Sequence, residues 1–515
     1  MARLFEYQGK EILRNAGVQI PRGKVADSPE AAGAAAAELA CPVVVKAQAW
    51  VTGRAGVGGI RFADTPDQAA EAAKAILGLS LKGFKVGYVL VEEKLNIERE
   101  CFAGIIIDDT ARKPMLIVSS IGGSGIEEIA REHPRAVART HIDIDTGLRD
   151  YTARNLLRSV GIKGKDQMQF GDLLVKLWQA ARKAEARAAE INPIVKTADG
   201  RWLAADCHMA IDDYAVFRHP ELGIEIAREF DRPATELEKI AYRVEEKDYR
   251  GTFYFIQLET DFGPGKGVIG FHGSGGGGSM MSMDALLDQG YKLANFCDTS
   301  GNPAASKVYR AARIILNQGP VDGYFLSGSG VASQEQFHSA RGLVKAFREE
   351  WLSIPAVIRP GGNGEDKAVE ILTRQTADLP APVEGYKKHD TPAFCASRMK
   401  ELLSKPVEPK ERPEPEPFST AYEFDSPTGK VLFDYDKCRA CESKACVEEC
   451  IPKILKLEDG VPVLAVTREE AARNKCIECL ACELECLAQG ERGCRIELPI
   501  PGLDEWIASR DEGEN

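Results

Sequence analysis

Pro42-Val-Val-Val-Lys-Ala-Gln48 is followed closely by Gly53-Arg-Ala-Gly-Val-Gly-Gly59 near the start of a chain of 515 residues. Three consecutive valines predict a buried strand, which leads directly into Lys46. A lysine at a strand end can place its charge on a phosphate, and a glycine-rich loop lets backbone N–H groups approach the same phosphate. These two segments therefore predict a phosphate-binding site.

Helices and strands alternate on both sides of these segments. Apolar residues recur at helical spacing before Gly17, and an alanine-rich helix follows the glycine-rich loop. The expected elements are helices over residues 4–16 and 67–77 and strands over 88–91, 101–107 and 115–119. This alternation predicts a mixed α/β region that ends near Arg232-Pro233.

Beyond Gly267 the pattern becomes more regular. Short apolar strands alternate with helices of ten or more residues, as in parallel sheets that are covered by helices on both faces. The expected strands are 268–271, 293–296, 323–326 and 356–358. This part of the chain is predicted to form a parallel, doubly wound sheet.

The composition is that of a globular protein with a local surplus of cysteine. A net charge of −12 argues against a general nucleic-acid binder, which needs a basic face for phosphates. The N-terminus has no signal-like apolar segment and no run of 18 apolar residues occurs, so we expect a cytoplasmic chain without a membrane span. Nine of the 14 cysteines lie at or beyond Cys438. In a reducing compartment such a cluster favours metal binding over disulfides.

The cysteines form two runs, Cys438-x2-Cys441-x4-Cys446-x3-Cys450 and Cys476-x2-Cys479-x2-Cys482-x3-Cys486. The runs resemble those of two-cluster bacterial ferredoxins, in which the fourth cysteine of each run ligates the other cluster. The resemblance implies a small α+β domain with two 4Fe-4S clusters and one-electron transfer. The implied ligands are Cys438, Cys441, Cys446 and Cys486 for the first cluster, and Cys476, Cys479, Cys482 and Cys450 for the second.

The first run departs from the ferredoxin pattern, and other metal sites remain open. Four residues rather than two separate Cys441 from Cys446, so a bulged loop or a 3Fe-4S cluster is an alternative. Four-cysteine zinc knuckles are a second alternative, although they favour two CxxC pairs on either side of a longer loop. Cys494 is left over and is expected to be a small buried residue.

A proline-rich, charged segment separates the cysteine runs from the rest of the chain. It contains Lys405-Pro-Val-Glu-Pro-Lys-Glu-Arg-Pro-Glu-Pro-Glu-Pro417, which has little to bury and predicts an extended tether. The acidic end, Arg510 to Asn515, is expected to be disordered. The expected divisions of the chain are 1–232, 233–385, a linker over 386–429, the cysteine-rich domain over 430–500 and a tail over 501–515.

Further motifs accompany the Lys46 segment across residues 1–385. They are Phe5-Glu-Tyr-Gln-Gly-Lys10, Gly122-Gly-Ser-Gly-Ile-Glu-Glu128, Glu190-Ile-Asn-Pro193, Ala215-Val-Phe-Arg-His-Pro-Glu-Leu222 and Arg359-Pro-Gly-Gly-Asn363. As a set they resemble the β subunit of succinyl-CoA synthetase and its ADP-forming acyl-CoA synthetase relatives. The resemblance implies an ATP-grasp nucleotide-binding domain, followed by a flavodoxin-like CoA-ligase domain.

This resemblance also implies the residues of the site. The implied nucleotide contacts are Lys46, Gly53, Arg54, Ala55, Glu92, Leu95 and Glu100. Asn192 and Asp206 match the pair that holds Mg²⁺, a hard ion that prefers oxygen ligands. Glu190 lies beside them and is expected to orient the phosphorylated group, so Lys46, Arg54 and Glu190 are the implied catalytic residues.

Two loops implied in carboxylate binding differ from the family pattern. Ser274-Gly-Gly-Gly277 stands where the family has Asn-Gly-Ala-Gly, and Gly330-Val331-Ala332 stands where it has Gly-Ile-Val. Serine is shorter than asparagine and rotates freely, so the pocket could accept a different acid. The resemblance therefore implies a carboxylic acid substrate without identifying it.

A glycine-rich loop supports a competing interpretation. Gly273-Ser-Gly-Gly-Gly-Gly278 satisfies G-x-G-x-x-G between a predicted strand and a predicted helix, and Asp298 follows about 20 residues on. Such a fingerprint would indicate a ferredoxin-linked NAD(P) oxidoreductase. Loops this rich in glycine also match the pattern by chance. His272 adjoins the loop and is expected to be a packing or hydrogen-bonding residue rather than a phosphate carrier.

The resemblance implies the conversion of carboxylate, CoA and ATP to acyl-CoA, ADP and phosphate, in either direction. No segment resembles the α subunit, so an α-type CoA-binding partner that carries the phosphohistidine is expected. Three roles of the ferredoxin-like part remain open. It could dock a redox enzyme such as a 2-oxoacid:ferredoxin oxidoreductase, take part in ATP-driven delivery of low-potential electrons, or only staple a small domain.

Overall fold

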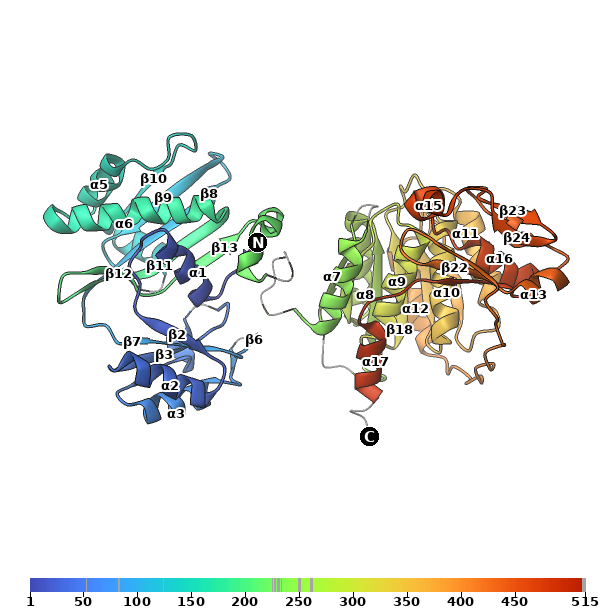
Figure 1. Cartoon of the computed structure of the whole chain (residues 1–515), viewed down its shortest axis with the longest axis horizontal. Coiled ribbons are helices and arrows are strands. Elements are labelled where there is room, and N and C mark those ends of the chain that lie inside the picture. Colours follow the sequence, from blue (N-terminus) through green and yellow to red (C-terminus); the bar gives the residue numbers. More distant parts are fainter. Residues whose placement is uncertain are drawn as a thin grey trace. The chain divides into compact units, whose positions relative to one another are not determined.

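The protein is described by a computed structural model in which the chain forms two compact units. The described residues are 1–511, except 52, 82, 83, 124, 225, 227, 229–231, 233, 249–251 and 260–262. The units are Met1–Ala234 and Thr235–Asn515 (Figure 1). Residue 233 of the expected domain boundary and residues 512–515 of the expected tail lie outside the described residues. No helix among the described residues combines the length and apolar character needed to cross a bilayer.

The first unit contains a small antiparallel sheet that carries the Lys46 segment. Its strand order is β2-β7-β3-β4, and the alanine-rich helices α2 and α3 pack against it (Figure 1). Ser28 and Thr65 cap these helices by accepting from the backbone N–H three residues on. The bounds are β2 Gly23–Ala26, α2 Pro29–Leu39, β3 Val43–Ala47, η1 Arg54–Val57, β4 Ile60–Ala63, α3 Pro66–Ile76 and β7 Val89–Glu93; a two-stranded ribbon pairs β5 Ser80–Leu81 with β6 Phe84–Lys85.

The larger sheet of this unit has the order β1-β13-β11-β8-β9-β10, with β12 paired to β11. Helices α1 and α6 pack on it and enclose a second apolar core. The bounds are β1 Ala2–Arg3, α1 Glu6–Asn15, β8 Ile97–Asp108, β9 Lys113–Ser119, α4 Ile126–Glu132, β10 Val137–His141, α5 Asp150–Ser159, α6 Gly164–Lys183, β11 Ala186–Thr197, β12 Trp202–Ala204 and β13 His208–Ile211; short 3₁₀ turns follow at η2 Pro134–Ala136, η3 Asp213–Arg218 and η4 Pro220–Leu222.

The second unit is built on the expected doubly wound sheet. Its order is β14-β17-β15-β18-β19-β20, in which only β14 runs antiparallel. The first parallel strand, β15, has the second and third on either side, which is the flavodoxin-like order. The bounds are α7 Glu236–Glu246, β14 Tyr254–Gln257, β15 Val268–Ser274, α8 Gly276–Asp288, β16 Lys292–Leu293, β17 Asn295–Asp298, α9 Ala305–Leu316, β18 Gly323–Gly328, α10 Phe337–Glu350, β19 Ala356–Arg359, α11 Glu365–Gln375 and β20 Val383–Gly385.

The predicted fold class is confirmed in both units, with one local difference. The single strand expected over 293–296 is divided between β16 and β17. Both pieces pair with β15, but Ala294 between them is fully buried and donates its N–H to Ile269.

The cysteine-rich part follows as a small α+β assembly in the same unit. A three-stranded antiparallel sheet, β21-β22-β25, lies beside a β23-β24 hairpin, and α14 packs against α16. The bounds are β21 Tyr422–Asp425, β22 Lys430–Phe433, α13 Tyr435–Ala440, α14 Ala445–Glu448, β23 Leu455–Glu458, β24 Val461–Leu464, α15 Arg468–Glu470, η5 Ala471–Lys475, α16 Ala481–Gln489 and β25 Cys494–Glu497.

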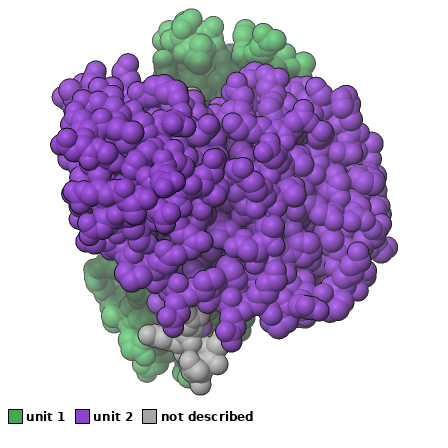
Figure 2. Space-filling model, turned by 90° about the vertical axis from the view of Figure 1, so that its right-hand side faces the viewer, with its two compact units in different colours: residues 1–234 green, residues 235–515 purple. Residues whose placement is uncertain are grey.

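One hydrophobic core joins the flavodoxin-like half to the cysteine-rich part. Tyr309 and Phe347 from the first and Phe424 and Phe433 from the second belong to the same buried cluster. Arg310 on α9 reinforces the joint by donating to the carbonyl oxygens of Pro499 and Thr428 and to the Thr428 hydroxyl. In the space-filling view this unit is one continuous body (Figure 2). The cysteine-rich part is therefore packed in place rather than tethered.

The prediction of an extended linker over residues 386–429 is wrong in part, because these residues include regular structure. Helix α12, Pro392–Leu403, lies inside it and buries Met399 and Leu402 against the sheet. The proline content of this stretch did not reveal the helix, because proline is tolerated in the first turn of a helix as well as in a linker. The proline-rich stretch itself has no helix or strand, but it is held to the surface: Trp351 Nε1 donates to the Lys410 carbonyl at 2.8 Å.

The prediction of an acidic tail over residues 501–515 is also wrong in part, because a helix forms there. Helix α17, Leu503–Asp511, forms there and packs Leu503, Trp506 and Ile507 against the shared core. The Trp506 indole donates to the carbonyl oxygen of Asn317 at 3.2 Å. Three apolar residues among the acidic ones were enough to order this segment.

Candidate functional site

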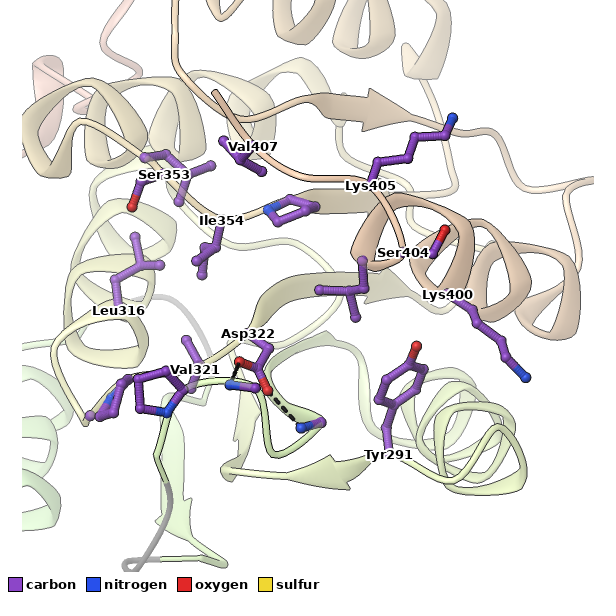
Figure 3. A pocket seen from close by; sticks show the side chains of 18 of the residues that line it. Tyr291, Leu316, Val321, Asp322, Ser353, Ile354, Lys400, Ser404, Lys405 and Val407 are labelled. Atoms are coloured by element: carbon purple, nitrogen blue, oxygen red, sulfur yellow. Dashed lines mark hydrogen bonds between the residues drawn. The ribbon is translucent and has the colours of Figure 1, made fainter. Parts of the chain in front are cut away.

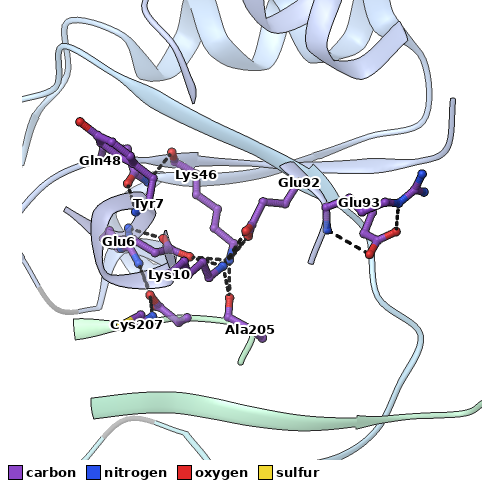
Figure 4. A network of polar contacts seen from close by, with 12 residues as sticks. Glu6, Tyr7, Lys10, Lys46, Gln48, Glu92, Glu93, Ala205 and Cys207 are labelled. Atoms are coloured by element: carbon purple, nitrogen blue, oxygen red, sulfur yellow. Dashed lines mark hydrogen bonds and ion pairs between the residues drawn. The ribbon is translucent and has the colours of Figure 1, made fainter. Parts of the chain in front are cut away.

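A buried network of charges surrounds Lys46 in the first unit (Figure 4). The Lys46 Nζ lies 2.9 Å from Glu6 Oε1 and 2.9 Å from Glu92 Oε2, and donates to the Ala205 carbonyl at 2.7 Å. Lys10 reaches the same groups: it lies 2.8 Å from Glu6, 2.7 Å from Glu92 and 2.8 Å from the Ala205 oxygen. The network thus connects α1, β3, β7 and the chain before β13.

Arg54 extends this network toward the predicted metal ligands. Its guanidinium lies 2.8 Å from Glu6 Oε2 and donates to the Ala47 carbonyl at 2.8 Å. It also donates to both oxygens of Asp206, at 2.9 and 2.8 Å. The Arg54 side chain is 4% exposed and that of Asp206 is 17% exposed, so Asp206 is the side of the pair that faces the more open space.

The charges of the network keep one another ionised. Burial opposes the charge of Glu6, but Lys10, Lys46 and Arg54 hold the pKa of its carboxyl well below the ordinary value. Burial likewise opposes the charge of Lys46, but Glu6, Glu92 and Asp206 raise its pKa above the ordinary value. Lys46 and the neighbouring Arg54 are therefore fixed as cations at the end of β3, where they could bind an anionic group.

The predicted Mg²⁺ ligands lie on adjoining segments. Asn192 is on β11, and its amide exchanges hydrogen bonds with the backbone of Gly123, at 2.9 and 3.3 Å. Ala205, next to Asp206, donates its N–H to the carbonyl of Pro193, next to Asn192. Glu190, two residues before Asn192, pairs with His208, two residues beyond Asp206. The structure thus brings Asn192, Asp206 and Glu190 onto adjoining segments, and metal binding by Asn192 and Asp206 stays a prediction.

The other predicted nucleotide contacts lie in different surroundings. Gly53 has a φ of +74°, and nothing lies within 4 Å of a Cβ placed there, so its loop borders open space. Glu92 is 2% exposed and bound to two lysines. Glu100 is exposed on β8. Ala55 lies in η1.

Leu95 belongs to a small apolar cluster, where it packs against Val195, Leu203 and Ala205. This contact fixes the chain between β7 and β8, where the small sheet passes into the large one. The role of Leu95 in nucleotide binding stays a prediction.

Sequence reasoning missed Glu6 and Lys10, although the first motif of the chain contains both. A signal was present: Glu6, Lys10 and Leu13 share one face of a helix, and that face is the buried one. Two charged residues on the apolar face of a helix indicate partners elsewhere in the fold, since unpaired buried charges are costly. The partners, Lys46, Glu92 and Arg54, come from separate strands and a loop.

The predicted substrate loops meet at one edge of the second unit. Ser274 ends β15, and its hydroxyl donates to the Ser300 carbonyl at 3.0 Å. Gly330 follows β18 with a φ of +79°, and Ala332 forms a parallel bridge with Gly362 beyond β19. This edge holds the carboxyl ends of β15 and β18, next to the point where the strand order reverses, and ligands of such sheets bind there. Val331 is 85% exposed at the same edge.

The glycine-rich fingerprint residues are engaged within the protein. Asp298, which the NAD(P) interpretation would place on a ribose, accepts from the N–H groups of Gly275 and Ser300 at 3.0 and 2.8 Å. A Cβ on Gly278 would lie 2.6 Å from Ser329 Cα, so close packing alone requires that glycine. His272 bonds to Tyr324 and Thr299, and burial lowers its pKa to about 3. A neutral, hydrogen-bonded histidine in this place agrees with a packing role.

Thiols of the two runs influence one another in two neighbourhoods, a first around Cys438, Cys441 and Cys486 and a second around Cys450, Cys479 and Cys482. Burial and then the thiols of Cys486 and Cys441 raise the pKa of Cys438 to about 12. Burial and then the Cys482 thiol raise the pKa of Cys479 to about 11, and Cys482 acts in the same way on Cys450. The fourth cysteine of each run thus lies near members of the other run. Packing of α14 against α16 is the cause, since these helices carry or adjoin residues of both runs.

Backbone N–H groups point at several of these sulfurs. Cys441 accepts from Lys444 and Glu491, and Cys486 accepts from Cys494 and Gly493. Left-handed conformations occur between the cysteines, at Lys444, Lys453, Glu478 and Leu480. Such turns form concave nests of N–H groups, which occur at many iron–sulfur sites. Within the described residues, no three His, Cys, Asp or Glu side chains converge as ligands of a single ion.

The largest cavity described lies away from all of these residues (Figure 3). It has a volume of 780 Å³ and lies at the amino ends of β15, β18 and β19, where Tyr291, Lys400 and Val407 line it. Asp322 in its wall accepts from the N–H groups of Gly265 and Gly267, both at 2.6 Å. Ligands of doubly wound sheets bind at the opposite, carboxyl edge, so this cavity is not part of the candidate site.

Comparison with a protein solved by experiment supports the same fold. The chain resembles ATP citrate lyase from Methanothrix soehngenii, solved with citrate and coenzyme A, with a TM-score of 0.64. The match covers 78% of this chain and 99% of the other, at 17% sequence identity. At this identity the likeness establishes the fold alone.

Comparison of sequences gives the family. Residues 3–196 match the ATP-grasp domain. The chain is 37% identical over 385 residues to the β subunit of the GDP-forming succinate–CoA ligase of Thermus thermophilus, covering 75% of this chain and 97% of that protein. It is 35% identical over 370 residues to the β subunit of the ADP-forming ligase of Methanothermobacter thermautotrophicus, covering 72% and 93%. The chain therefore belongs to the family of succinate–CoA ligase β subunits.

Proposed function

We propose that the chain is the β-type subunit of an ADP-forming acyl-CoA synthetase. It would convert a carboxylate, CoA and ATP to acyl-CoA, ADP and phosphate, and the reverse reaction would form ATP. The observation that carries this proposal is the pair of buried cations, Lys46 and Arg54, beside Asp206 in a chain of this family. Fixed cations of this kind stabilise the charge that is transferred with a phosphoryl group.

The proposed nucleotide site is the end of β3. Lys46 and Arg54 would take the phosphates, the open loop at Gly53 would let backbone N–H groups approach them, and Asn192 and Asp206 would hold Mg²⁺. Oxygen ligands on adjoining segments suit that ion. For Asp206 to bind it, the Asp206–Arg54 pair has to open, and a nucleotide phosphate is the natural replacement partner for Arg54.

The proposed acid and CoA sites involve the second unit and a partner chain. Ser274 and the loop Gly330–Ala332 border the carboxyl edge of the sheet, next to the amino end of α8, where a carboxylate is favoured. An α-type subunit would bring most of the CoA site and the histidine that carries the phosphoryl group. ATP citrate lyase, which was solved with citrate and coenzyme A, has the same fold but is named for a different reaction, so it does not identify the acid.

A binding and turnover experiment tests this proposal. The full chain, purified anaerobically together with any α-type partner, is assayed for ADP formation with CoA and a panel of dicarboxylates, tricarboxylates and monocarboxylates. We expect one class of acid to support CoA-dependent ADP formation. If no acid does so while Mg-ATP binds, the synthetase proposal fails; if Mg-ATP itself does not bind, the nucleotide site fails with it.

We further propose that the cysteine-rich part binds two 4Fe-4S clusters. Cys438, Cys441, Cys446 and Cys486 would hold the first, and Cys476, Cys479, Cys482 and Cys450 the second. The two thiol neighbourhoods and the N–H groups directed at the sulfurs support these sets. When bound, such clusters supply one-electron transfer at low potential. The electrons would pass to or from a redox enzyme, such as a 2-oxoacid:ferredoxin oxidoreductase.

The iron content of two variants tests the ligand sets. Cys486→Ala should lose the first cluster and halve the iron and sulfide of the anaerobically purified chain. Cys494→Ala is the matched control, because Cys494 is equally buried and bonded to Cys482 but is not a proposed ligand. It should keep the full content. Equal loss from both variants, or zinc in place of iron, would contradict the assignment.

The shared core favours a second candidate function. The cysteine-rich part is packed against α9 and α10 of the flavodoxin-like half, so binding of the acid or CoA in that half during ATP turnover could act on the clusters. The chain would then deliver low-potential electrons in a way that depends on ATP. Measuring ADP formation with the clusters oxidised and reduced separates the two functions: turnover that ignores the cluster state favours the synthetase with a separate redox role.

A further inference from the structure

Arg341 on α10 is a buried cation with unused hydrogen-bonding capacity. Its side chain is 1% exposed, and none of its three nitrogens has a hydrogen-bond partner within the described residues. It lies over the ring of Phe337, 5.2 Å from the centroid. Buried guanidinium groups are costly unless their N–H groups are satisfied, so this side chain indicates an acceptor that the protein atoms do not provide.

The nearest carboxylate does not satisfy Arg341. Glu485 on α16 lies 3.8 Å away, which is an ion pair without a hydrogen bond. Glu485 is also shared: Arg374 lies 3.4 Å from its other oxygen, and Gln489 donates to that oxygen at 2.8 Å. Two arginines therefore face one carboxylate, and the surplus positive charge lies inside the protein.

Arg341 lies beside the second cysteine neighbourhood. Burial and the Cys482 thiol raise the pKa of Cys479, and Arg341 is close enough to oppose that rise. Glu485, its ion-pair partner, sits on α16 between Cys482 and Cys486. The next cation along α10, Lys345, differs because it lies 2.8 Å from each of two carboxylates, Glu483 and Glu349. Lys345 is thus neutralised by two carboxylates, whereas Arg341 shares a single carboxylate with Arg374. Of these two cations of α10, Arg341 is the one whose positive charge is less compensated beside the thiols.

The first neighbourhood has a different cation. Burial and the neighbouring thiols raise the pKa of Cys438, and Lys444 opposes that rise. Lys444 is only half-buried, however, and its ammonium already donates to the Cys438 carbonyl. Charges interact more strongly where water is excluded. Arg341, whose side chain is 1% exposed, is therefore less screened by water than Lys444.

We propose that Arg341 tunes the second cluster, the one held by Cys450, Cys476, Cys479 and Cys482, and makes it easier to reduce than it would be without this cation. This inference rests on the proposed clusters. Reduction adds one electron, supplied by a redox partner, and one negative charge to the cluster, and a buried cation stabilises that charge. Because α10 begins a few residues after the loop Gly330–Ala332, Arg341 lies on the helix that leads from the proposed substrate edge.

Redox titration of the full chain tests the proposal. EPR spectra are followed during anaerobic titration of the wild type, Arg341→Met, Arg341→Gln and Arg341→Lys. Cys450→Ser identifies which signal belongs to the second cluster. In the two neutral variants that signal should need a potential lower by about 59 mV or more, a tenfold change in the one-electron equilibrium, while the other signal moves less. Arg341→Lys should restore part of the shift.

Arg374→Met is the matched control, because it removes the other arginine of Glu485 from a half-exposed position. It should move neither potential by that amount. Unchanged potentials in both neutral variants, or an equal shift in Arg374→Met, would overturn the proposal. Loss of the fold or of both clusters in all three Arg341 variants would also overturn it, by assigning the residue to structure. A wild-type chain without iron would instead overturn the proposed clusters.

Discussion

Lys10 and Lys46 donate hydrogen bonds to the same backbone oxygen, the carbonyl of Ala205, at 2.8 and 2.7 Å. Two ammonium groups that share one acceptor repel each other, and the carboxylates of Glu6 and Glu92 compensate this by contacting both. Of the two lysines, Lys10 is 2% exposed and Lys46 is 11% exposed in its side chain. Lys10 is thus the supporting cation and Lys46 the one that a ligand can reach.

Replacing Lys46 by alanine should weaken the binding of Mg-ATP to the full chain by about tenfold to a hundredfold. A hydrogen bond to a charged group contributes about 1.5–3 kcal/mol, and tenfold is about 1.4 kcal/mol. Isothermal titration calorimetry measures the change, with the visible absorption of the proposed clusters as a check on the rest of the chain. Lys24→Ala, in an exposed surface pair with Glu38, should bind as the wild type does. Equal affinities of wild type and Lys46→Ala would remove Lys46 from the site.

Replacing Glu6 by glutamine should destabilise the first unit by about 3–5 kcal/mol, because it removes the carboxylate that contacts all three buried cations, Lys10, Lys46 and Arg54. Denaturant unfolding followed by tryptophan fluorescence measures the loss, since Trp50, Trp178 and Trp202 lie in this unit. Glu11→Gln, in an exposed pair with Arg14, should change the free energy of unfolding by less than about 1 kcal/mol. Similar losses in both variants would contradict the role of the buried network.

The stability of the first unit should fall on acidification below about pH 4, in part through Glu6. Its folded pKa is held well below the ordinary value, against the effect of burial, by Lys10, Lys46 and Arg54. A carboxyl with a depressed folded pKa contributes stability that is present above its unfolded pKa, about 4.3, and is lost as the pH falls through the folded pKa. Unfolding curves between about pH 6 and pH 3 measure this. The fall should be shallower in Glu6→Gln, and parallel curves would contradict the assignment.

Replacing Phe433 by alanine should destabilise the second unit by about 3–5 kcal/mol, since a fully buried phenylalanine leaves a cavity. Because Phe433 belongs to the core that contains residues of both halves, unfolding should remain one transition that shifts as a whole. Differential scanning calorimetry and the visible absorption of the proposed clusters should report the same midpoint. Phe394→Ala, 45% exposed, is the control with a small effect. Separate midpoints for the two signals would contradict a shared core.

Local patterns in the sequence predicted part of this structure. The valine run before Lys46 predicted β3, and the short strands after Gly267 predicted the doubly wound sheet. Lys46, Arg54 and Asp206 were predicted as one site and lie together. Glu6 and Lys10 were not predicted, because their role depends on where β3, β7 and the chain before β13 meet. Local periodicity can mark a charged residue on a buried face, but it does not name its partner.

The relation between the cysteine-rich part and its neighbours was also beyond the sequence. Spacing of the cysteines predicted two groups of four thiols, and this grouping stays a prediction. The apolar residues around them, such as Phe424 and Phe433, would serve equally well in a core of their own. That they complete the core of the flavodoxin-like half is a long-range property, and the proline-rich stretch suggested the opposite.

That common core has a consequence for how this chain can be inherited and engineered. A ferredoxin on a free tether can be gained, lost or moved to another enzyme as a cassette. Here, excision of the cysteine-rich part would strip α9 and α10 of their apolar cover and leave the two halves with complementary apolar faces. Each half covers apolar residues of the other, so the two are expected to change in sequence together.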